Sequence, residues 1–320
     1  MAKVVITDYE YPDIEAEKRI ISGAGHELLG YHAENEAELM SVTRDADAVI
    51  VQCAGITRKI VENLAHCRMI IKYGVGINNI DAAAATERGI WVCNVPDYGL
   101  DEVSAHASAL ILSLARKLPA ADRAMKQGGF GNSHFRPLSR FAGSTLGIVG
   151  FGAIGSLVAR KMGGFSLRIL AYDPFFDQEK AKALGVEAAS FETLCRESDF
   201  ITVHCPLYDR TEHMFNRAVF QSMKKTAYFV NTSRGGVVRE EDLIAALESG
   251  EIAGAGIDVY ETEPPKAGNR LLSLPNVICT GHVAWYSEEA IVALQRKAAE
   301  EVVNVLAGNK PFHPCNQVAS

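Results

Sequence analysis

The 320-residue sequence has no apolar run long enough to cross a membrane, and it has no excess of basic charge. Its 32 Lys and Arg against 39 Asp and Glu give a formal net charge of −7. This balance argues against nucleic acid and against an anionic membrane surface as partners. A small anionic substrate remains compatible with it, because one pocket can be positive within an acidic protein. The first residues show no secretory leader pattern and enter an apolar strand at once.

Cysteine pairs with the spacing of a metal site are also missing. The seven cysteines are scattered, odd in number and without a C-x-x-C pair. Such usage is typical of reduced thiols in the cytoplasm, so we expect a cytoplasmic protein with no disulfide framework. The same spacing predicts no metal site.

What the sequence does contain is a glycine-rich turn between an apolar run and a helix-like segment. Gly150, Gly152 and Gly155 form G-x-G-x-x-G, with apolar residues 146–149 before them and a helical stretch from residue 153 to 162 after them. A further apolar run ends at Asp173, about 20 residues on, as a dinucleotide fingerprint requires. The glycines allow the tight turn and the close approach of a pyrophosphate, which the N–H groups of the helix N-terminus would bind.

Asp173 also indicates which dinucleotide binds. A carboxylate there accepts hydrogen bonds from ribose hydroxyls and repels a 2′-phosphate. The residues that follow are Pro174, Phe175 and Phe176, so no adjacent arginine is present to hold such a phosphate. The sequence therefore predicts NAD rather than NADP as the cofactor.

Strand–helix alternation extends on both sides of the glycine turn. Before it, apolar strands are expected at 4–6, 48–51, 69–71 and 90–92, and after it at 167–172, 200–204, 228–231, 252–257 and 277–279. Such alternation with short connections predicts an α/β chain with two doubly wound parallel-sheet lobes.

The fingerprint lies too late in the chain for a simple Rossmann protein. A long helix from about Glu102 to Lys126 is expected to join the lobes, and an amphipathic helix from Glu288 to Leu306 to return the chain to the first lobe. We therefore expect a Rossmann NAD-binding domain, residues 101–286, inserted into a flavodoxin-like substrate-binding domain. The latter is discontinuous and comprises residues 1–100 plus 287–320.

Polar clusters follow the later strands of the predicted cofactor lobe, where sites of parallel sheets form. They supply a cation, Arg234, a histidine, His282, and two acids, Glu261 and Glu263. Reduction of a 2-oxo acid needs a proton carrier near neutral pH, which suits histidine, and a directional cation for the carboxylate, which suits arginine. A neighbouring acid would orient the imidazole and favour its protonated form. Spacing alone leaves open whether Glu261 or Glu263 is that acid.

A second glycine-rich loop follows a strand of the first lobe. Gly74 and Gly76 flank Val75 and allow successive backbone N–H groups to converge on an anion. We interpret this loop as the other half of the carboxylate site.

Together these motifs resemble the D-isomer-specific 2-hydroxyacid dehydrogenase family over nearly the full chain. The resemblance implies that Arg234 binds and polarises the substrate, that His282 is the acid/base, and that Glu263 is its partner. It also implies a homodimer formed through the NAD-binding domain. The motifs that carry it are YGVGINNID (73–81), GFGAIG (150–155) with Asp173, HCPL (204–207), NTSRGG (231–236), GIDVYETEP (256–264) and GHVAW (281–285).

The resemblance extends to the residues that contact the ligands. Asp258 matches the position that holds the nicotinamide amide, and Gly74, Val75 and Gly76 match backbone positions that receive the substrate carboxylate. The full set expected at the cofactor is Gly150, Gly152, Ala153, Ile154, Gly155, Asp173, Cys205, Pro206, Thr211, Thr232, Ser233, Asp258 and Trp285.

Two function classes follow from the sequence. The first is an NAD-dependent oxidoreductase that interconverts a small 2-oxo acid and its D-2-hydroxy acid. The second is an NAD(H)-sensing binding protein, because WYSEEA (285–290) resembles the subgroup that includes the C-terminal-binding-protein corepressors, beside phosphoglycerate-dehydrogenase-like members. A third reading is oxidation of another anion, such as phosphite or formate. The substrate side chain stays open, as does whether Arg136 or Arg140 reaches it.

Overall fold

The computed structural model describes residues 1–318 and divides the chain into two compact units. Unit 1 comprises Met1–Gly99 and the chain from Ser287 onward, and unit 2 comprises Leu100–Tyr286. Among the described residues, no helix is long and apolar enough to cross a membrane. The seven cysteines are all unbonded.

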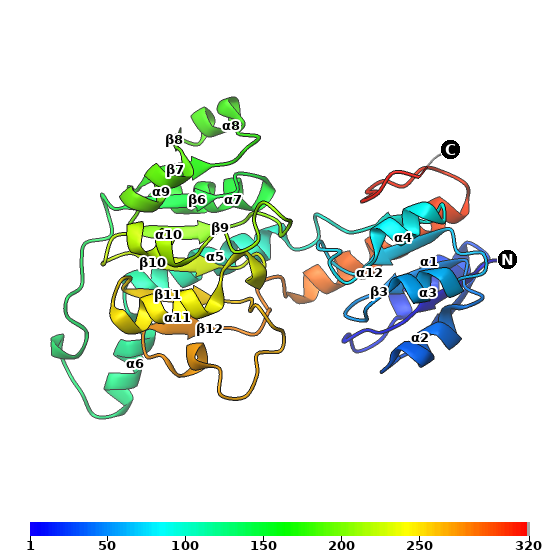
Figure 1. The fold of residues 1–320 in the computed structure, drawn as a ribbon, viewed down its shortest axis with the longest axis horizontal. Helices are drawn as coiled ribbons and strands as arrows, with labels where there is room; N and C mark the ends of the chain where they lie inside the picture. The colour runs from blue at the N-terminus through cyan, green and yellow to red at the C-terminus, as the bar shows by residue number, and fades with distance from the viewer. Residues whose placement is uncertain (319–320) are drawn as a thin grey trace. The chain divides into compact units, whose positions relative to one another are not determined.

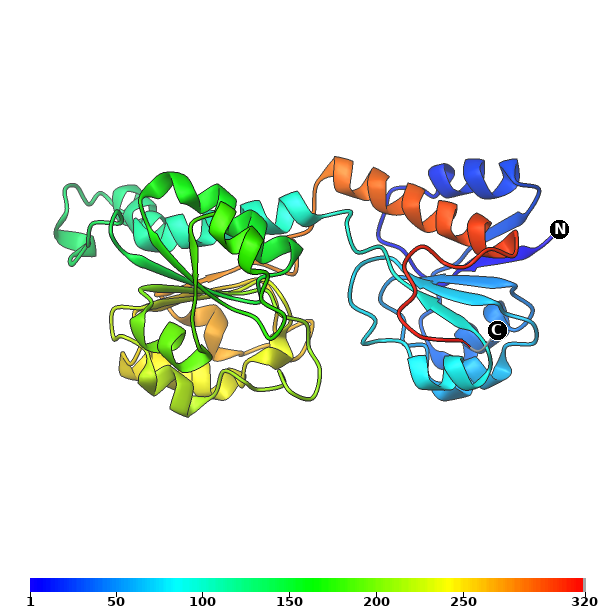
Figure 2. The same cartoon turned by 90° about the horizontal axis from the view of Figure 1, so that it is seen from above.

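Unit 1 is built on a parallel sheet of five strands in the order β2-β1-β3-β4-β5, which is the flavodoxin-like order. Its central strands are buried on both faces, as continuous apolar runs such as Ala48–Val51 require. Helices α1 and α12 pack together on one face, and α3 and α4 cover the other (Figures 1 and 2). The elements are β1 (Lys3–Ile6), α1 (Glu15–Gly23), β2 (Glu27–Gly30), α2 (Glu36–Thr43), β3 (Ala48–Val51), α3 (Arg58–Asn63), β4 (Met69–Lys72), α4 (Ala82–Glu87), β5 (Trp91–Cys93) and α12 (Glu288–Leu306).

Unit 2 has seven parallel strands in the order β12-β11-β10-β9-β6-β7-β8. The strand order reverses between β6 and β9, which is where doubly wound folds bind their ligands. The elements are α5 (Leu100–Ala115), α6 (Leu118–Lys126), η1 (Ser133–Phe135), β6 (Thr145–Val149), α7 (Ala153–Met162), η2 (Gly163–Phe165), β7 (Arg168–Tyr172), α8 (Gln178–Ala183), β8 (Val186–Ala188), α9 (Phe191–Glu197), β9 (Phe200–Val203), α10 (Arg217–Ser222), β10 (Tyr228–Asn231), η3 (Gly235–Val237), α11 (Glu240–Ser249), β11 (Gly254–Ile257), η4 (Arg270–Ser273) and β12 (Val277–Cys279).

Two apolar layers enclose the sheet of unit 2. On one face α7 packs on β6, and α5 packs on β10, β11 and α7, around Leu110, Ile111 and Ile148. On the other face the core gathers around Phe215 and Phe229, whose ring centroids lie 4.8 Å apart. The two all-parallel sheets confirm the predicted α/β class.

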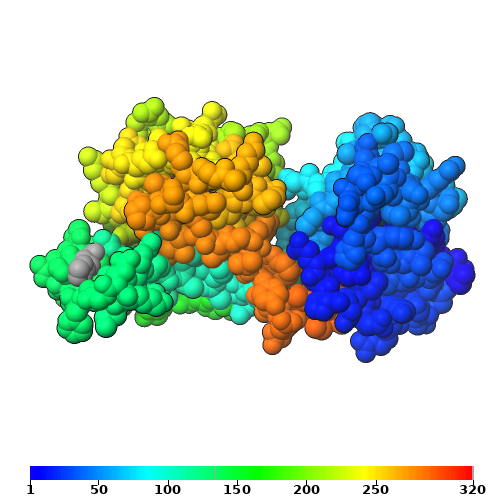
Figure 3. Space-filling model, turned by 90° about the horizontal axis from the view of Figure 1, so that it is seen from below, coloured from blue at the N-terminus to red at the C-terminus, as the bar shows by residue number. Residues whose placement is uncertain are grey.

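The single helix predicted from Glu102 to Lys126 is wrong. Helix α5 ends at Ala115, and Lys117 adopts a left-handed backbone with φ of 48° before α6 begins. Pro119 explains the break, because its ring would clash with the carbonyl of Ala115 in a continuous helix. The chain then forms an arm, residues 118–140, that projects from the rest of unit 2 (Figure 3).

Candidate functional site

The polar clusters that the sequence singles out gather at one edge of the unit 2 sheet. All seven strands are parallel, so the loops that follow β6, β9, β10, β11 and β12 emerge at their common carboxyl edge (Figure 1). The glycine turn after β6 and His204 after β9 lie in contact there, since a Cβ on Gly150 would be 2.7 Å from the His204 carbonyl carbon.

The glycine turn leaves space at one of its three glycines. Gly150 has a φ of 94°, and a Cβ on Gly155 would lie 2.1 Å from the Gly150 carbonyl oxygen, so neither position accepts a side chain. A Cβ on Gly152, in contrast, would meet no atom within 4 Å. Helix α7 starts directly after it, and no side chain caps the first turn. An open, uncapped helix N-terminus suits the pyrophosphate of a dinucleotide.

Asp173 ties the glycine turn to the end of β7. Its Oδ2 accepts a hydrogen bond of 2.8 Å from the N–H of Phe151, and its Oδ1 accepts one of 2.8 Å from the N–H of Phe175. The carboxylate is thereby fixed beside the turn, where it can also accept from ribose hydroxyls.

Two buried polar atoms at the same edge lack a hydrogen-bond partner within residues 1–318. They are Oγ1 of Thr232 and Nδ1 of His204, whose Nε2 pairs with Thr202 Oγ1 at 3.0 Å. Burial lowers the pKa of His204 to about 3, so its ring is neutral. Unsatisfied buried groups cost about 1–3 kcal/mol each and call for an explanation such as a bound ligand. With the open glycine turn, they fit a dinucleotide along this edge.

Other residues of the predicted cofactor set stabilise their own loop. The Thr211 hydroxyl donates to the Pro206 carbonyl at 2.6 Å and accepts from the N–H of Tyr208 at 3.0 Å. It therefore closes the turn after β9. Burial raises the pKa of the Cys205 thiol to about 12, so this thiol stays protonated. Trp285 packs edge-on against Tyr286, with ring centroids 5.9 Å apart.

His282 and Glu263 form a close pair after β12 and β11. His282 Nδ1 lies 2.7 Å from Glu263 Oε2, and Glu263 Oε1 accepts a hydrogen bond of 2.9 Å from the N–H of Tyr260. Burial raises the pKa of Glu263, but these two hydrogen bonds and the charges of His282 and Arg234 outweigh it, and the net pKa is below the ordinary value. The acid beside His282 is therefore Glu263, present as a carboxylate.

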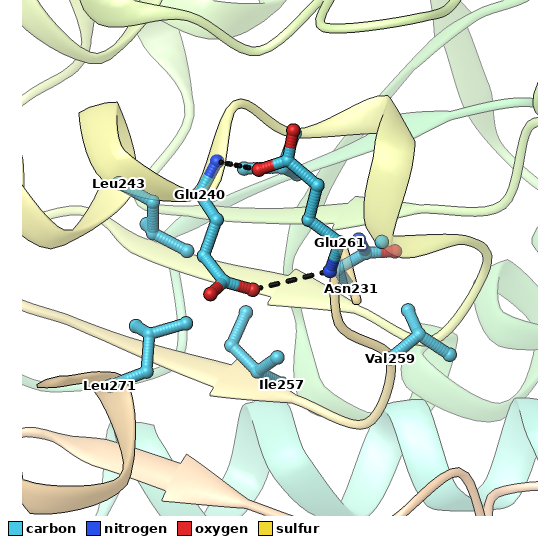
Figure 4. Close-up of a pocket in the computed structure, with 9 residues that line it drawn as sticks. Asn231, Glu240, Leu243, Ile257, Val259, Glu261 and Leu271 are labelled. Carbon is cyan, nitrogen blue, oxygen red and sulfur yellow. Dashed lines mark hydrogen bonds between the residues drawn. The ribbon is translucent and has the colours of Figure 1, made fainter. Parts of the chain in front are cut away.

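Glu261 belongs to a different cluster. Its Oε1 lies 2.6 Å from Nε2 of His213, and its Oε2 accepts from the N–H of Glu240 at 3.1 Å. The Glu240 carboxylate in turn accepts a hydrogen bond of 3.2 Å from the N–H of Glu261 (Figure 4). These two hydrogen bonds join the start of α11 to the loop after β11. The cavity beside them measures about 10 Å³, room for about one water molecule and too small for a substrate.

Asp258 holds the loop that carries His282. Its carboxylate is fully buried and accepts hydrogen bonds from Thr280 Oγ1 at 2.6 Å and from the N–H groups of Val283 and Ala284 at 3.0 Å each. The Asp258 carbonyl accepts from the N–H of His282 at 2.7 Å. His282 has a φ of 57°, a strained backbone for a non-glycine residue that persists only where its surroundings fix it. In this structure the carboxylate that the resemblance assigns to the nicotinamide amide is engaged by the His282 loop.

Arg234 is positioned by Asn231 and Gly235, which the sequence analysis named within NTSRGG without a role in positioning. Buried Asn231 accepts hydrogen bonds from Ser233 N at 3.0 Å and Ser233 Oγ at 2.8 Å, and its amide donates to the Arg234 carbonyl at 2.9 Å. A Cβ on Gly235 would lie 1.8 Å from the Tyr260 carbonyl oxygen, so the two loops touch through their backbones. The signal for Asn231 was present, because an Asn at a strand end favours such a side-chain turn.

The glycine loop of unit 1 presents backbone donors. Gly74 has a φ of 131°, and its carbonyl accepts from the N–H of Val95 at 3.0 Å, while the Val75 carbonyl accepts from Asn94 Nδ2 at 2.6 Å. With both carbonyls held, the N–H groups of Val75 and Gly76 donate to no other group in the described chain. Such a pair of N–H groups suits an anion.

Some candidate ligands are not brought together. Arg136 and Arg140 are exposed on the arm. In residues 1–318 no group of three His, Cys, Asp or Glu side chains is close enough to hold a metal ion.

Residues 108–284 match a family model described as "D-isomer specific 2-hydroxyacid dehydrogenase, NAD binding domain". The chain is 38% identical to D-3-phosphoglycerate dehydrogenase of Methanocaldococcus jannaschii, over 96% of this chain and 58% of that protein. It is 39% identical to glyoxylate reductase of Korarchaeum cryptofilum, over 86% of this chain and 84% of that protein.

Among solved structures, the chain is similar to NAD-dependent formate dehydrogenase from Staphylococcus aureus in complex with NAD. The TM-score is 0.89 at 28% identity, over 99% of this chain and 100% of that one. The chain spans about half the length of the phosphoglycerate dehydrogenases that it matches, at 44–58% of each. The predicted cofactor is confirmed: unit 2 is an NAD-binding domain.

Proposed function

The chain belongs to the D-isomer-specific 2-hydroxyacid dehydrogenase family, and from that premise we propose that it interconverts a small 2-oxo acid and its D-2-hydroxy acid with NAD. The observation that carries the proposal is the pair of His282 and Glu263, 2.7 Å apart, with the charge of Arg234 acting on Glu263. An imidazole, a carboxylate and a guanidinium are the groups that reduction of a 2-oxo acid requires.

When bound, NAD would accept a hydride from the hydroxy acid, and NADH would donate a hydride to the oxo acid. Gly152 and the first turn of α7 would hold the pyrophosphate, and Asp173 would accept hydrogen bonds from the adenosine ribose. Thr232 and His204 provide polar atoms that have no partner within residues 1–318. The other residues proposed to contact the cofactor are Gly150, Ala153, Ile154, Gly155, Cys205, Pro206, Thr211, Ser233, Asp258 and Trp285.

His282 moves the proton. With Nδ1 directed at Glu263, the other ring nitrogen, Nε2, remains to give a proton to the substrate oxygen during reduction and to remove it during oxidation. The Glu263 carboxylate orients the ring and stabilises its protonated form. Asp258 keeps the His282 backbone in its left-handed conformation through the loop from Thr280 to Ala284.

Arg234 binds the substrate carboxylate and polarises the ketone. In unit 1, the backbone N–H groups of the Gly74–Gly76 loop would bind an anionic group. The planar guanidinium donates directionally to carboxylate and carbonyl oxygens, which lysine does not match. Asn231 and Gly235 fix the backbone from which Arg234 extends.

A turnover assay tests this function. The purified protein is mixed with NADH or NADPH and with glyoxylate, pyruvate, hydroxypyruvate or oxaloacetate, and absorbance of the reduced cofactor is followed. We expect turnover with at least one acid, and faster with NADH than with NADPH because of Asp173. The matched variant Arg234→Ala should lose about 10³-fold in kcat/KM, which corresponds to the loss of a charge-assisted contact in the transition state. Full activity in that variant would contradict the role of Arg234.

The same assay separates the enzyme from the NAD(H)-sensing alternative. If no acid is turned over although NADH binds tightly, the sensing role is favoured and the proposal of catalysis fails. Binding is measured by NADH fluorescence and does not depend on the substrate tried.

We also propose a homodimer formed through unit 2. The arm carries apolar side chains that unit 2 leaves exposed: Leu118 is 54%, Met125 61% and Phe130 88% exposed. Helix α6 buries no residue. A second copy would cover them, since exposed apolar clusters of this kind mark protein interfaces. Light scattering after gel filtration should give twice 34.7 kDa, and Phe130→Asp with Met125→Asp should give the monomer.

A further inference from the structure

Unit 1 contains a cleft of about 180 Å³ between the end of β5, helix α12 and the segment that follows α12. About 10–15 Å³ of such space holds one water molecule, so this cleft has room for a ligand of several atoms. Every residue that lines it belongs to unit 1, so the cleft is complete within that unit. The side chains that define its chemistry are Val95, Lys297, Glu300, Glu301, Phe312 and His313.

Glu301 brings a buried carboxylate to this cleft with one oxygen unsatisfied. The residue is only 2% exposed, and its Oε1 accepts a hydrogen bond of 3.1 Å from the N–H of His313. Its Oε2 has no hydrogen-bond partner in the described part of the chain. The Cys93 thiol lies next to this carboxylate, and burial and the charge of Glu301 raise the pKa of the thiol, which is only a weak donor. A buried carboxylate is costly unless it is paired, so Glu301 calls for a strong donor.

The cations near the cleft are engaged with other acids. Lys297 Nζ lies 2.6 Å from Asp97 Oδ2, and this contact holds the pKa of Asp97 below its ordinary value. Arg296 Nη1 donates to both carboxylate oxygens of Glu300, at 2.8 and 2.9 Å. With histidine counted as neutral, these two bases offset two of the three acids. The negative charge that remains is that of Glu301.

The walls around Glu301 suit a short carbon chain. Val95 is buried in the wall after β5, and Phe312 adds an apolar ring that is 64% exposed. The terminal torsion of a glutamate is broad, so a small rotation of the carboxylate turns an oxygen into the cleft without moving α12. A ligand there would meet one carboxylate oxygen and apolar surface.

We propose that this cleft binds a monovalent organic cation, a primary ammonium on a short alkyl chain, whose N–H groups donate to Glu301. An ammonium supplies three strong donors and one positive charge, which matches the unsatisfied oxygen and the single uncompensated charge. The bound molecule would lie between α12 and residues 312–313. It would therefore hold the segment after α12 on unit 1 and stabilise that unit.

The test compares three probes with the same carbon chain. n-Butylamine is a cation at pH 7.5, 1-butanol is neutral and butyrate is an anion. Isothermal titration calorimetry on the full chain should give a Kd of about 1 mM for butylamine, and binding at least about tenfold weaker for the other two. 4-Aminobutyrate keeps the ammonium and adds a carboxylate, and it should also bind about tenfold more weakly because the cleft is already negative.

Selective labelling of histidine with ¹⁵N locates the site. The N–H of His313 donates to Glu301, so its NMR signal should shift when butylamine binds, whereas butyrate should leave it in place. The signal is identified as the one that disappears in His313→Gln.

Glu301→Gln keeps the shape of the side chain and removes the uncompensated charge, so it should weaken butylamine binding at least about tenfold. Glu300→Gln is the matched control. It removes the same charge from the same helix and the same cleft, but from an acid that Arg296 already pairs, and it should change the Kd less than about threefold. Circular dichroism checks the fold of both variants, and the comparison of probes on the wild-type protein needs neither.

Several results would overturn this site. They are no butylamine binding below about 50 mM, equal Kd values for butylamine and any of the other three probes, an unmoved His313 signal, or equal losses in the two variants. None of these measurements uses turnover, so the result leaves the proposed oxidoreductase function to its own test.

Discussion

Unit 2 contains two histidine–glutamate pairs that look alike as isolated contacts. His282 and Glu263 are 2.7 Å apart, and His213 and Glu261 are 2.6 Å apart. Both histidines have a left-handed backbone, with φ of 57° and 49°. Both acids come from the one loop after β11. A short contact between an imidazole and a carboxylate therefore does not by itself identify a catalytic pair.

The surroundings separate the two pairs. Glu263 is subject to the positive charge of Arg234, and its histidine loop is held by a fully buried Asp258. Glu261 instead exchanges backbone hydrogen bonds with Glu240. The first pair lies among groups that can bind and polarise an anion, while the second joins the loop after β11 to the start of α11. The comparison predicts that one pair serves chemistry and the other serves the fold.

The largest expected effect follows from removing each imidazole in turn. His282→Gln should lower kcat about 10³-fold, the scale of a lost general acid, while NADH binding stays unchanged. His213→Gln should lower kcat less than about threefold. Both are measured by steady-state turnover on the best 2-oxo acid. Equal losses would mean that the two pairs cannot be told apart by their surroundings.

A smaller effect is expected from the two acids. Glu263→Gln should lower kcat about 30-fold, because the imidazole loses the carboxylate that orients it for proton transfer. The pKa of Glu263 is below its ordinary value, so its negative charge is present at neutral pH and is lost only as the pH falls through that lowered pKa. Glu261→Gln is the control and should lower kcat less than about threefold. An equal loss in both variants would contradict the assignment of Glu263.

His204, a histidine with no carboxylate beside it, sharpens the comparison. Its pKa of about 3 is below that of an unfolded histidine, so its contribution to stability is complete above about pH 6.5 and decreases as the pH falls. The free energy of unfolding of unit 2 should fall by about 2 kcal/mol between pH 6.5 and pH 5 from this residue.

His204→Gln should remove that part of the pH dependence. Urea denaturation in a Trp91→Phe background measures it, because Trp285 is then the only tryptophan of the chain and reports on unit 2. An unchanged slope in His204→Gln would show that another group is responsible.

The smallest effect concerns the support of the His282 loop. Thr280→Val removes one of the hydrogen bonds that Asp258 accepts and should lower the free energy of unfolding by about 1 kcal/mol. Thr86→Val is a control of the same chemistry on the surface of α4, where the hydroxyl donates to the Ala82 carbonyl at 2.7 Å, and it should cost less. A Thr280→Val protein as stable as the wild type would contradict a supporting role for this hydroxyl.

The sequence predicted most of the buried framework. Continuous apolar runs mark strands such as β3 and β9, and the glycine turn identifies β6 and α7 together with the cofactor. The edge strands β2 and β8 were not predicted, because an edge strand such as Glu27–Gly30 needs few apolar residues and its alternation is too short to stand out. The break at Pro119 was overlooked because the apolar spacing continues through it.

The sequence predicted which residue types the site contains and that they follow strand ends, but not which side chains meet. Glu261 and Glu263 are two residues apart in an irregular loop, so no periodicity tells which acid meets His282. The N–H of Tyr260 settles it by binding Glu263 Oε1, which is a backbone contact that the sequence does not encode locally. The buried amide of Asn231, in contrast, binds residues two and three positions further along the chain, which is a local turn that an Asn at a strand end favours.

The backbone contact between Gly235 and Tyr260 holds the loop after β10 against the loop after β11. Since their backbones touch with no room for a single methyl group, the guanidinium and the acid cannot be displaced independently. Exchange of these loops between relatives must therefore transfer residues 231–236 and 258–264 together, and a graft of either loop alone should fail even when every side chain of the proposed site is kept.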